Sequence, residues 1–441
     1  MLHTSVFPQG RPRLPRIPRK LAMKLRPALI VFLLAAAAGF TFAAVSTADF
    51  VQHLDRQTHS LSCSFVPGLG RDASGSSGCH AALMSPYSSA FRTWLWGGIP
   101  TTLAGMAVYA FLFWRAARMA LDGKATDKAA TTFLLAATGM PVAASIVYGS
   151  ISAFILGELC KTCAGMYASS AVLAIAAIAL VWGARKPSPP PPAEEGDDEA
   201  PPENLDAAPA PTPAYGMTFA WGAAEASAFV VAPVLAYLVL APDFSDKLGQ
   251  CGELIKPADP AHLFVPLGGP PNGVKAIELI DPLCPSCAAF EDRLAFSGLD
   301  ARLSRSAVMF PLDNACNWMV GSAVHPGACA ISEAVLCAEG DGTKVLAWAF
   351  EHGEAIKTAS AADPAAAARM VGEAFPGVRG CVGSDKARQR VNRSLRWAVQ
   401  NQLPIVTPQL FVDGVRLCDE DTDLGLDWAL TKMLAGRKEA R

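Results

Sequence analysis

The chain has 441 residues and a mass of 46.2 kDa, enough for two or three domains, which excludes a single small domain. Only 17% of its residues are charged while 51% are hydrophobic, and a mean hydropathy of +0.28 disfavours a simple cytosolic protein. The formal net charge of −2 gives no basic field that would attract a polyanion, so we expect no nucleic-acid partner.

Five apolar stretches in the first 242 residues indicate membrane-spanning helices. Four of them lack Asp, Glu, Lys and Arg, and each is long enough to cross a hydrocarbon layer of about 30 Å as a helix. These four are residues 27–48, 93–114, 129–157 and 162–184. The fifth, 215–242, contains Glu225; because a charge is costly in lipid, we expect its hydrophobic part to start just after that residue.

Basic residues at the ends of these stretches define their orientation. Residues 1–27 form a basic tail with seven Lys or Arg, four more follow the second stretch, and Arg185 and Lys186 follow the fourth. The positive-inside rule places these segments in the cytoplasm, so the loop after the first stretch and the turn at 158–161 lie outside it. The alternative for residues 1–45 is a cleaved signal peptide.

Residues 186–214 separate the four-span domain at 28–185 from the rest of the chain. After Lys186 this segment contains ten prolines, seven acidic residues and no basic one, which predicts a solvated spacer without a core. Because the linker starts in the cytoplasm, only a further crossing at 215–242 brings the C-terminal part to the outer side.

Residues 243–441 are numerous enough to bury a core of their own. Their pattern predicts a strand, a helix and a strand, then a helical insertion, and finally a helix, a β-hairpin and a last helix. The predicted elements cover residues 276–280, 288–294, 307–312, 328–374, 385–401, 409–418 and 423–434.

Two Cys-x-x-Cys pairs make thiol chemistry the central question. In the soluble part, CPSC follows the first strand and starts a helix, which brings Cys284 and Cys287 within disulfide distance. The amides and dipole at a helix start favour a thiolate, so we expect a lowered pKa and the attacking role for Cys284, with Cys287 as the resolving thiol.

The segments IELIDPLCPSC and VTPQLFVDG resemble the thioredoxin-like, DsbA-like dithiol oxidases. The resemblance implies a thioredoxin fold and a cis peptide bond between Thr407 and Pro408. It also implies that Pro408 lies beside the active disulfide, where the neighbouring backbone holds the substrate chain.

The second pair, CKTC, contains Cys160 and Cys163 and opens the fourth stretch, where a dithiol can meet a lipid-soluble acceptor. Together with the loop cysteines Cys63 and Cys79 and the serine of CHAALMSPY, it resembles the vitamin K epoxide reductase family. The resemblance implies that Cys163 faces a quinone of the ubiquinone or menaquinone type, that Cys160 exchanges with the loop cysteines and that Ser85 holds the quinone by a hydrogen bond. The loop between the two cysteines is longer than is usual in the family; we favour a shuttle over a purely structural clamp.

Six cysteines remain, all in the part predicted to lie outside the cytosol, where disulfides persist. The sequence alone permits fifteen pairings. The expected pairs are Cys337–Cys381, Cys316–Cys329 and Cys251–Cys418. The first follows from the resemblance to DsbA-like proteins with a second disulfide, and the other two are guesses. A structural zinc site is the alternative for the two Cys-x-x-Cys pairs, but they belong to different domains, so we expect no metal.

Aromatic and histidine side chains complete the set of candidates. Trp94, Trp96 and Trp114 flank the second stretch and are predicted to anchor it at the membrane interface. His80 and His325 are predicted to be surface or hydrogen-bonded residues without a role, because thiol exchange does not need a histidine here.

These features predict a multi-pass protein of the bacterial inner membrane. Its fold would combine a four-helix transmembrane bundle and a fifth linking span with an α/β thioredoxin fold that has a helical insertion. Reduced secreted or periplasmic proteins would pass electrons to CPSC, then to the loop pair, CKTC and quinone, after docking of the two domains within one chain. The alternatives are a disulfide isomerase or reductase fed through the membrane, and a membrane-tethered binding or metal module with structural cysteines.

Overall fold

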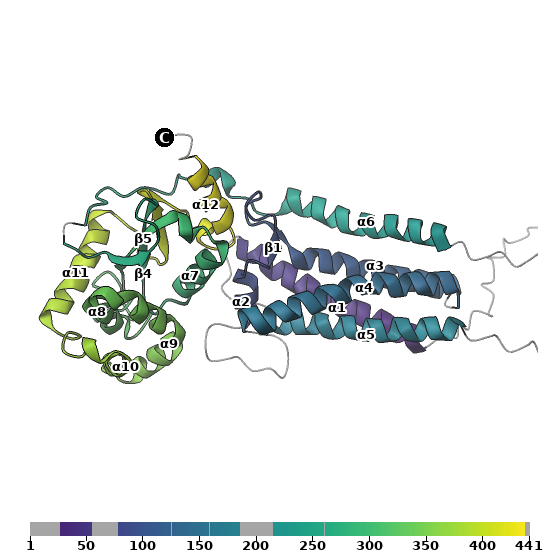
Figure 1. Cartoon of the computed structure of the whole chain (residues 1–441), viewed down its shortest axis with the longest axis horizontal. Helices are drawn as coiled ribbons and strands as arrows, with labels where there is room; N and C mark the ends of the chain where they lie inside the picture. Colours follow the sequence, from purple (N-terminus) through teal and green to yellow (C-terminus); the bar gives the residue numbers. More distant parts are fainter. Residues whose placement is uncertain are drawn as a thin grey trace, which may run out of the picture.

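The computed structural model describes residues 27–54, 78–124, 126–157, 159–185, 215–259 and 261–436. The expectations for the basic tail, for Cys63 and for the Pro-rich linker therefore lie outside the described residues. Figure 1 shows two units in one elongated molecule, a bundle of long helices and a mixed helix–sheet unit attached to one end of it.

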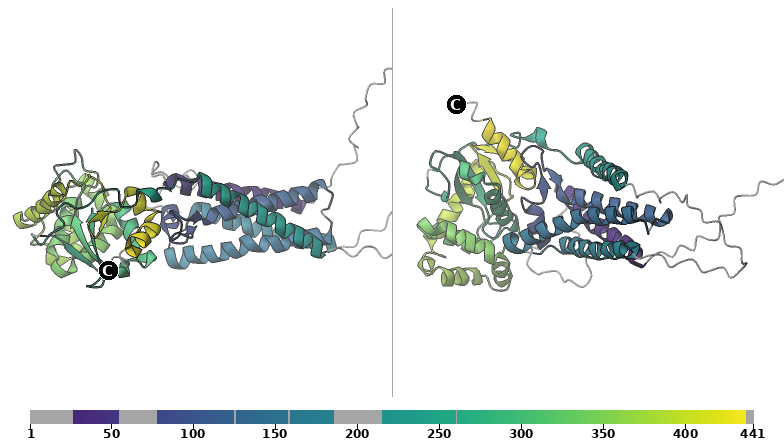
Figure 2. Two further views of the ribbon diagram at one scale, coloured as in Figure 1. Left: turned by 90° about the horizontal axis from the view of Figure 1, so that it is seen from above. Right: turned by 45° about the vertical axis from the view of Figure 1, so that its right-hand side comes forward.

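Long helices form the N-terminal unit. They are α1 Pro27–Leu54, α3 Thr101–Leu121, α4 Lys128–Ile151 with a π-helical turn at Ser152–Leu156, α5 Lys161–Arg185 and α6 Tyr215–Leu240. Helix α1 packs against both α3 and α5, α4 packs against α5, and α6 runs along α3 (Figures 1 and 2). In the described residues four helical segments are long and apolar enough to cross a membrane, namely Pro27–Leu54, Lys128–Leu156, Lys161–Arg185 and Tyr215–Lys247.

The helix at the second stretch begins and ends later in the chain than predicted. Residues 93–100 are a turn followed by the short strand β2 Ile99–Pro100, which pairs with β1 Ser89–Ala90, and the helix begins only at Thr101. Gly98 explains the delay, since its φ of 73° is left-handed and a Cβ there would meet the Ala90 carbonyl oxygen at 2.6 Å.

The charges in α3 and α6 form a pair inside the helical unit. Arg115 lies within α3 rather than after it, and Glu225 lies within α6 rather than before it. The Arg115 Nη1 atom is 3.2 Å from the Glu225 Oε2 atom, and the guanidinium also lies over the ring of Phe133. Because each charge compensates the other, both helices tolerate a residue that the apolar pattern alone would exclude.

The C-terminal unit contains a five-stranded sheet with the order β3-β5-β4-β6-β7. The strands are β3 Val265–Gly268, β4 Val274–Ile280, β5 Leu303–Met309, β6 Gln409–Val412 and β7 Val415–Arg416, and only β4 and β5 are parallel. Side chains alternate across the sheet: Leu410 and Val412 pack into one hydrophobic core and Phe411 into another.

Helices cover both faces of this sheet. Helices α7 Pro285–Ser297 and α12 Leu426–Ala435 pack on one face. The other face is covered by α8 Ala328–Cys337, α9 Gly342–Ala362, α10 Ala366–Ala374 and α11 Asp385–Gln400 (Figure 1). This is a thioredoxin fold with a helical insertion, as predicted; strand β3 was not predicted.

We predict that Gly98→Ala destabilises the junction between the two units. The substitution places a Cβ against the Ala90 carbonyl in a left-handed backbone, so the free energy of unfolding should fall by more than about 1 kcal/mol. Gly123→Ala is the matched control, since Gly123 has a similar φ of 68° and nothing within 4 Å of an added Cβ. Thermal unfolding in detergent measures both, and equal losses would contradict the role assigned to the contact.

Candidate functional site

The CPSC segment forms the start of α7, directly after β4. Cys284 is the N-cap residue and Pro285 the first helical residue, where the missing N–H of proline costs no intrahelical hydrogen bond. Cys284 is 5% exposed and Cys287 is 1% exposed. The Cys284 Sγ atom lies 3.8 Å from the Thr407 carbonyl oxygen, and the peptide bond between Thr407 and Pro408 is cis. The structure therefore brings Cys284, Cys287 and Pro408 together.

The two thiols of CPSC differ in acidity. A hydrogen bond from the Cys287 side chain lowers the pKa of Cys284 to about 6, although burial opposes the shift. Burial raises the pKa of Cys287 well above its ordinary value, and the adjacent Cys284 sulfur adds to this effect. At neutral pH Cys284 is therefore the more acidic of the two thiols, and Cys287 stays protonated.

The CKTC segment lies at the end of the helical unit that faces the sheet. Cys160 immediately precedes α5 and is 3% exposed, and Cys163 is in the first turn of that helix. The Cys163 backbone N–H donates to the Cys160 Sγ atom at 3.4 Å, and the Thr162 Oγ1 atom is 3.1 Å from the same sulfur. A hydrogen bond from the Cys163 side chain, followed by that from Thr162, lowers the pKa of Cys160 to about 6, against the effect of burial.

A third sulfur reaches this pair from helix α2 Gly78–Met84. The Sγ atoms of Cys79 and Cys160 are 3.4 Å apart, and Cys79 is disulfide-bonded. A thiolate at Cys160 is thus in contact with a disulfide sulfur, which is the geometry that thiol–disulfide exchange requires. Cys63, the other loop cysteine of the prediction, lies outside the described residues.

A cavity of about 550 Å³ lies among α1, α3, α4 and α5 next to these sulfurs. Cys79, Cys160 and Cys163 line it, together with Ser85 and Tyr167. Tyr167, which the sequence analysis missed, is one turn after Cys163, and its side chain hydrogen-bonds with that of Cys163. Ser85 is buried, and its hydroxyl donates a hydrogen bond to the Ala82 carbonyl at 2.8 Å. The hydroxyl proton is therefore not available to a ligand in the cavity.

A second cavity, of about 500 Å³, separates the two dithiols. Cys284 and Pro285 line it from the sheet unit, and Met84, Ser85 and Leu156 line it from the helical unit. Ser85 and Leu156 line both cavities. The two redox pairs therefore open into adjacent spaces at one end of the bundle.

A buried charged cluster joins the two units beside these cavities. Arg293 of α7 donates to the Met84 carbonyl at 2.8 Å and lies 3.1 Å from the Asp427 carboxylate, which is also 3.3 Å from Arg92. The sequence analysis missed Arg293. The available signal was its spacing, since it follows the core residue Phe290 by three positions and so shares its buried helix face.

Trp96 belongs to the same junction and corrects a prediction. It is 7% exposed, and its indole N–H donates to the Asp421 Oδ1 atom at 2.7 Å, whereas Trp94 is 77% exposed. Trp96 packs in a hydrophobic cluster with Phe50 and Leu424, so it contacts the sheet unit instead of a lipid interface.

The remaining six cysteines lie in three disulfides within the sheet unit. The structure brings together Cys251 with Cys418, Cys316 with Cys329 and Cys337 with Cys381. These are the pairs named from the sequence.

Comparisons with known proteins separate the two units. Residues 30–178 match the family model described as vitamin K epoxide reductase family. Among solved structures, α-DsbA1 of Wolbachia pipientis is 14% identical, with 42% of this chain and 95% of that chain covered and a TM-score of 0.33. DsbA of Xylella fastidiosa is 16% identical, with 39% and 89% covered and a TM-score of 0.29. No curated protein matches the chain.

The fold and the two dithiols define a membrane thiol–disulfide oxidoreductase. Its helical unit matches the vitamin K epoxide reductase family model over residues 30–178, and its C-terminal unit has a thioredoxin fold.

We predict that Thr162→Val raises the pKa of Cys160 by about one unit, because it removes a hydrogen bond that stabilises the thiolate. Acid protonates the Cys160 thiolate, so alkylation of Cys160 should fall below pH 6 in the parent protein and at a higher pH in the variant. Alkylation rates, read by mass spectrometry of the Cys160 peptide, measure the midpoint. Thr132→Val, at an exposed threonine of α4, is the control; a midpoint that stays unchanged in Thr162→Val would refute the assignment.

Proposed function

We propose that the protein is a disulfide-forming enzyme of the bacterial inner membrane that oxidises secreted or periplasmic proteins and reduces a membrane quinone. The observation that carries the proposal is the arrangement of sulfurs at one end of the bundle: Cys160 touches Cys79, Cys163 lines the larger cavity, and Cys284 lines the cavity next to it. Each step of the proposed route then moves two electrons between neighbouring sulfur pairs.

The route begins at CPSC. A thiolate of a reduced client attacks the Cys284–Cys287 disulfide at Cys284, and the second client thiol displaces Cys284, leaving an oxidised client and a dithiol at CPSC. The Cys284 thiolate then attacks the loop disulfide formed by Cys63 and Cys79, and Cys287 resolves the mixed disulfide. The low pKa of Cys284 makes it both a good leaving group and a populated nucleophile.

The second half of the route runs through CKTC. The reduced loop pair attacks the Cys160–Cys163 disulfide at Cys160, which the 3.4 Å contact with Cys79 supports, and the loop disulfide is restored. Cys160 and Cys163 then hold two electrons and two protons as a dithiol. Their reoxidation completes the cycle with Cys163 as the sulfur that faces the acceptor.

The larger cavity fits a quinone head group in size and chemistry. Its volume of about 550 Å³ lies within the usual range of small-molecule sites. The cavity is bounded by membrane helices, and a lipid-soluble molecule can enter between them. A bound quinone would accept the two electrons and two protons. Tyr148 and Tyr167 line the cavity, and their hydroxyl groups can donate hydrogen bonds to the carbonyl oxygens of the quinone. The Ser85 hydroxyl already donates to the Ala82 carbonyl, so we assign Ser85 only a supporting contact with the quinone.

The contact between the two units favours thiol–disulfide exchange within the chain over separation of the units. Arg293, Asp427 and Trp96 hold the thioredoxin-fold domain against the helical unit, so Cys284 meets the loop sulfurs at a high effective concentration. The positive residues at the opposite ends of the spans support a periplasmic location for this junction.

We predict that Cys163→Ala abolishes quinone reduction by a reduced dithiol peptide. Without Cys163 the CKTC segment cannot form the disulfide that accepts two electrons from the loop pair, so turnover should fall to background while the thioredoxin-fold domain stays folded and CPSC still exchanges with the peptide. Anaerobic absorbance of a soluble quinone analogue measures turnover. Ser150→Ala, in an exposed position of α4, is the control. Undiminished turnover in Cys163→Ala would refute the electron route.

A further inference from the structure

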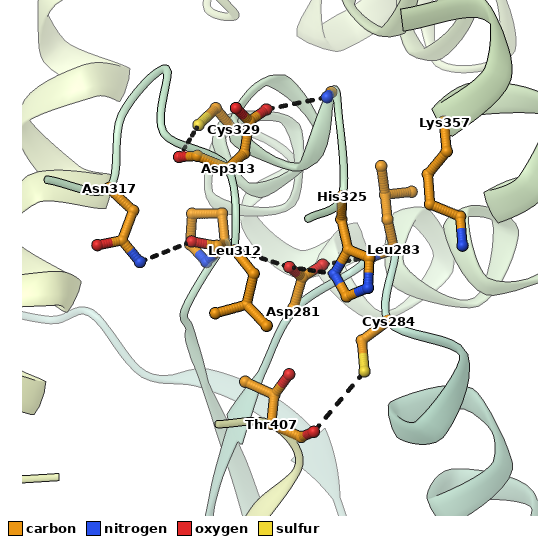
Figure 3. Close-up of polar contacts among 12 residues, drawn as sticks. Asp281, Leu283, Cys284, Leu312, Asp313, Asn317, His325, Cys329, Lys357 and Thr407 are labelled. Atoms are coloured by element: carbon orange, nitrogen blue, oxygen red, sulfur yellow. Dashed lines mark hydrogen bonds and ion pairs between the residues drawn. The ribbon is translucent and has the colours of Figure 1, made fainter. Parts of the chain in front are cut away.

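A buried histidine lies next to the CPSC site. His325 precedes α8, is 7% exposed, and its Nδ1 atom is 2.8 Å from the Asp281 Oδ2 atom. Asp281 is fully buried three residues before Cys284, at the end of β4. Figure 3 shows the His325 ring next to both the Asp281 carboxylate and Cys284. From the sequence, this histidine was expected to be a surface or hydrogen-bonded residue without a role.

Asp281 is held rigidly. Its Oδ1 atom accepts the Leu283 N–H at 2.7 Å, its Oδ2 atom accepts the Leu312 N–H at 2.6 Å, and its backbone carbonyl accepts the Cys284 N–H at 3.2 Å. These hydrogen bonds satisfy a carboxyl group that has no contact with solvent, as burial of a polar group requires. The same residue orients both the imidazole and the segment that begins α7.

The loop that carries His325 is also anchored. Asp313 accepts the backbone N–H groups of Ala315 and Gly327 at 3.0 and 2.9 Å, and the His325 N–H donates to the Leu312 carbonyl at 3.1 Å. The disulfide between Cys316 and Cys329 closes this loop at its base (Figure 3 shows Cys329 beside Asp313). The imidazole is thereby kept in one position over the reactive cysteine.

We propose that His325, oriented by Asp281, is the cationic partner of the Cys284 thiolate and makes this sulfur the attacking and leaving atom of the CPSC site. The catalytic use of this pairing rests on the proposed function. The pairing itself rests on the geometry of Asp281, His325 and Cys284. The charged or titratable groups that face the imidazole are these two and Lys357 of α9, which is itself paired with Glu354 at 2.5 Å.

Asp281 and His325 have opposite effects on the Cys284 thiolate. Burial lowers the pKa of His325, but the hydrogen bond and charge of Asp281 and the Cys284 thiolate outweigh it, so the pKa of His325 is raised overall. Because coupling between two titrating groups is reciprocal, protonated His325 in turn favours the Cys284 thiolate. Asp281 alone has the opposite effect and raises the pKa of Cys284. His325 thus screens the sulfur from a buried negative charge.

His325→Gln tests the proposal in the full chain, because glutamine can still donate to Asp281 but carries no charge. The measurement is the rate of Cys284 alkylation by iodoacetamide against pH in reduced protein, resolved from Cys287 by tandem mass spectrometry. We expect the midpoint to move up by about one unit, the low end for loss of a neighbouring opposite charge. His352→Gln is the matched control, since His352 lies in α9 on Trp348; it should leave the midpoint unchanged.

A second measurement needs no substitution at the site. In protein with labelled histidine, NMR should show His325 titrating at a higher pH when Cys284 is a thiolate than when it is in the Cys284–Cys287 disulfide, with His325→Gln identifying the signal. An unchanged Cys284 midpoint in His325→Gln, or a His325 titration that is the same in both redox states, would overturn the proposal. Neither readout uses quinone or client, so the result for His325 stands whether or not the protein reduces quinone.

Discussion

The proposed electron relay depends on one buried junction, where Arg293 of the thioredoxin-fold domain donates to the Met84 carbonyl of the helical unit and pairs with Asp427. Removing Asp427 would leave the buried guanidinium of Arg293 without its carboxylate, which is costly, so the pair favours a single docked arrangement. Trp96 adds a neutral donor to Asp421, and burial raises the pKa of Asp421 to about 6. These contacts keep the two dithiols at adjacent cavities.

The two Cys-x-x-Cys pairs share the same local features although they lie in unrelated folds. In each, the first cysteine sits at a helix start, accepts a hydrogen bond from the second and has a pKa of about 6. The local helix geometry therefore favours a thiolate in both cases, whether the helix packs on a sheet or in a membrane bundle. What differs is the surroundings: Cys163 lines an apolar cavity, whereas Cys284 has the polar neighbours Asp281 and His325.

Local patterns predicted much of the fold and of the dithiols, because apolar runs, the Cys-x-x-Cys spacing and the Thr-Pro segment each act over a few residues. Contacts between distant segments leave no such pattern. Asp281 and His325 are 44 positions apart, and Trp96 and Asp421 are 325 apart, so neither pair is visible before folding. The late start of α3 was missed because the apolar run begins before the helix and includes the turn at Gly98, whose left-handed backbone delays the helix. Strand β3 was missed because its four residues, VPLG, do not alternate between apolar and polar side chains.

The central claim is that the sulfurs of the two units exchange within one chain, and trapping the intermediate tests it most directly. In the variant Cys287→Ala the Cys284 thiolate can still attack the loop disulfide at Cys63 and release the Cys79 thiol, but no CPSC thiol is left to resolve the mixed disulfide. A bond between Cys63 and Cys284 should therefore accumulate in cells and appear as a linked peptide pair by mass spectrometry. The account predicts that this pair dominates and that both cysteines are accessible only from the periplasm. Cys284 found only in bonds to other proteins, or located in the cytoplasm, would contradict it.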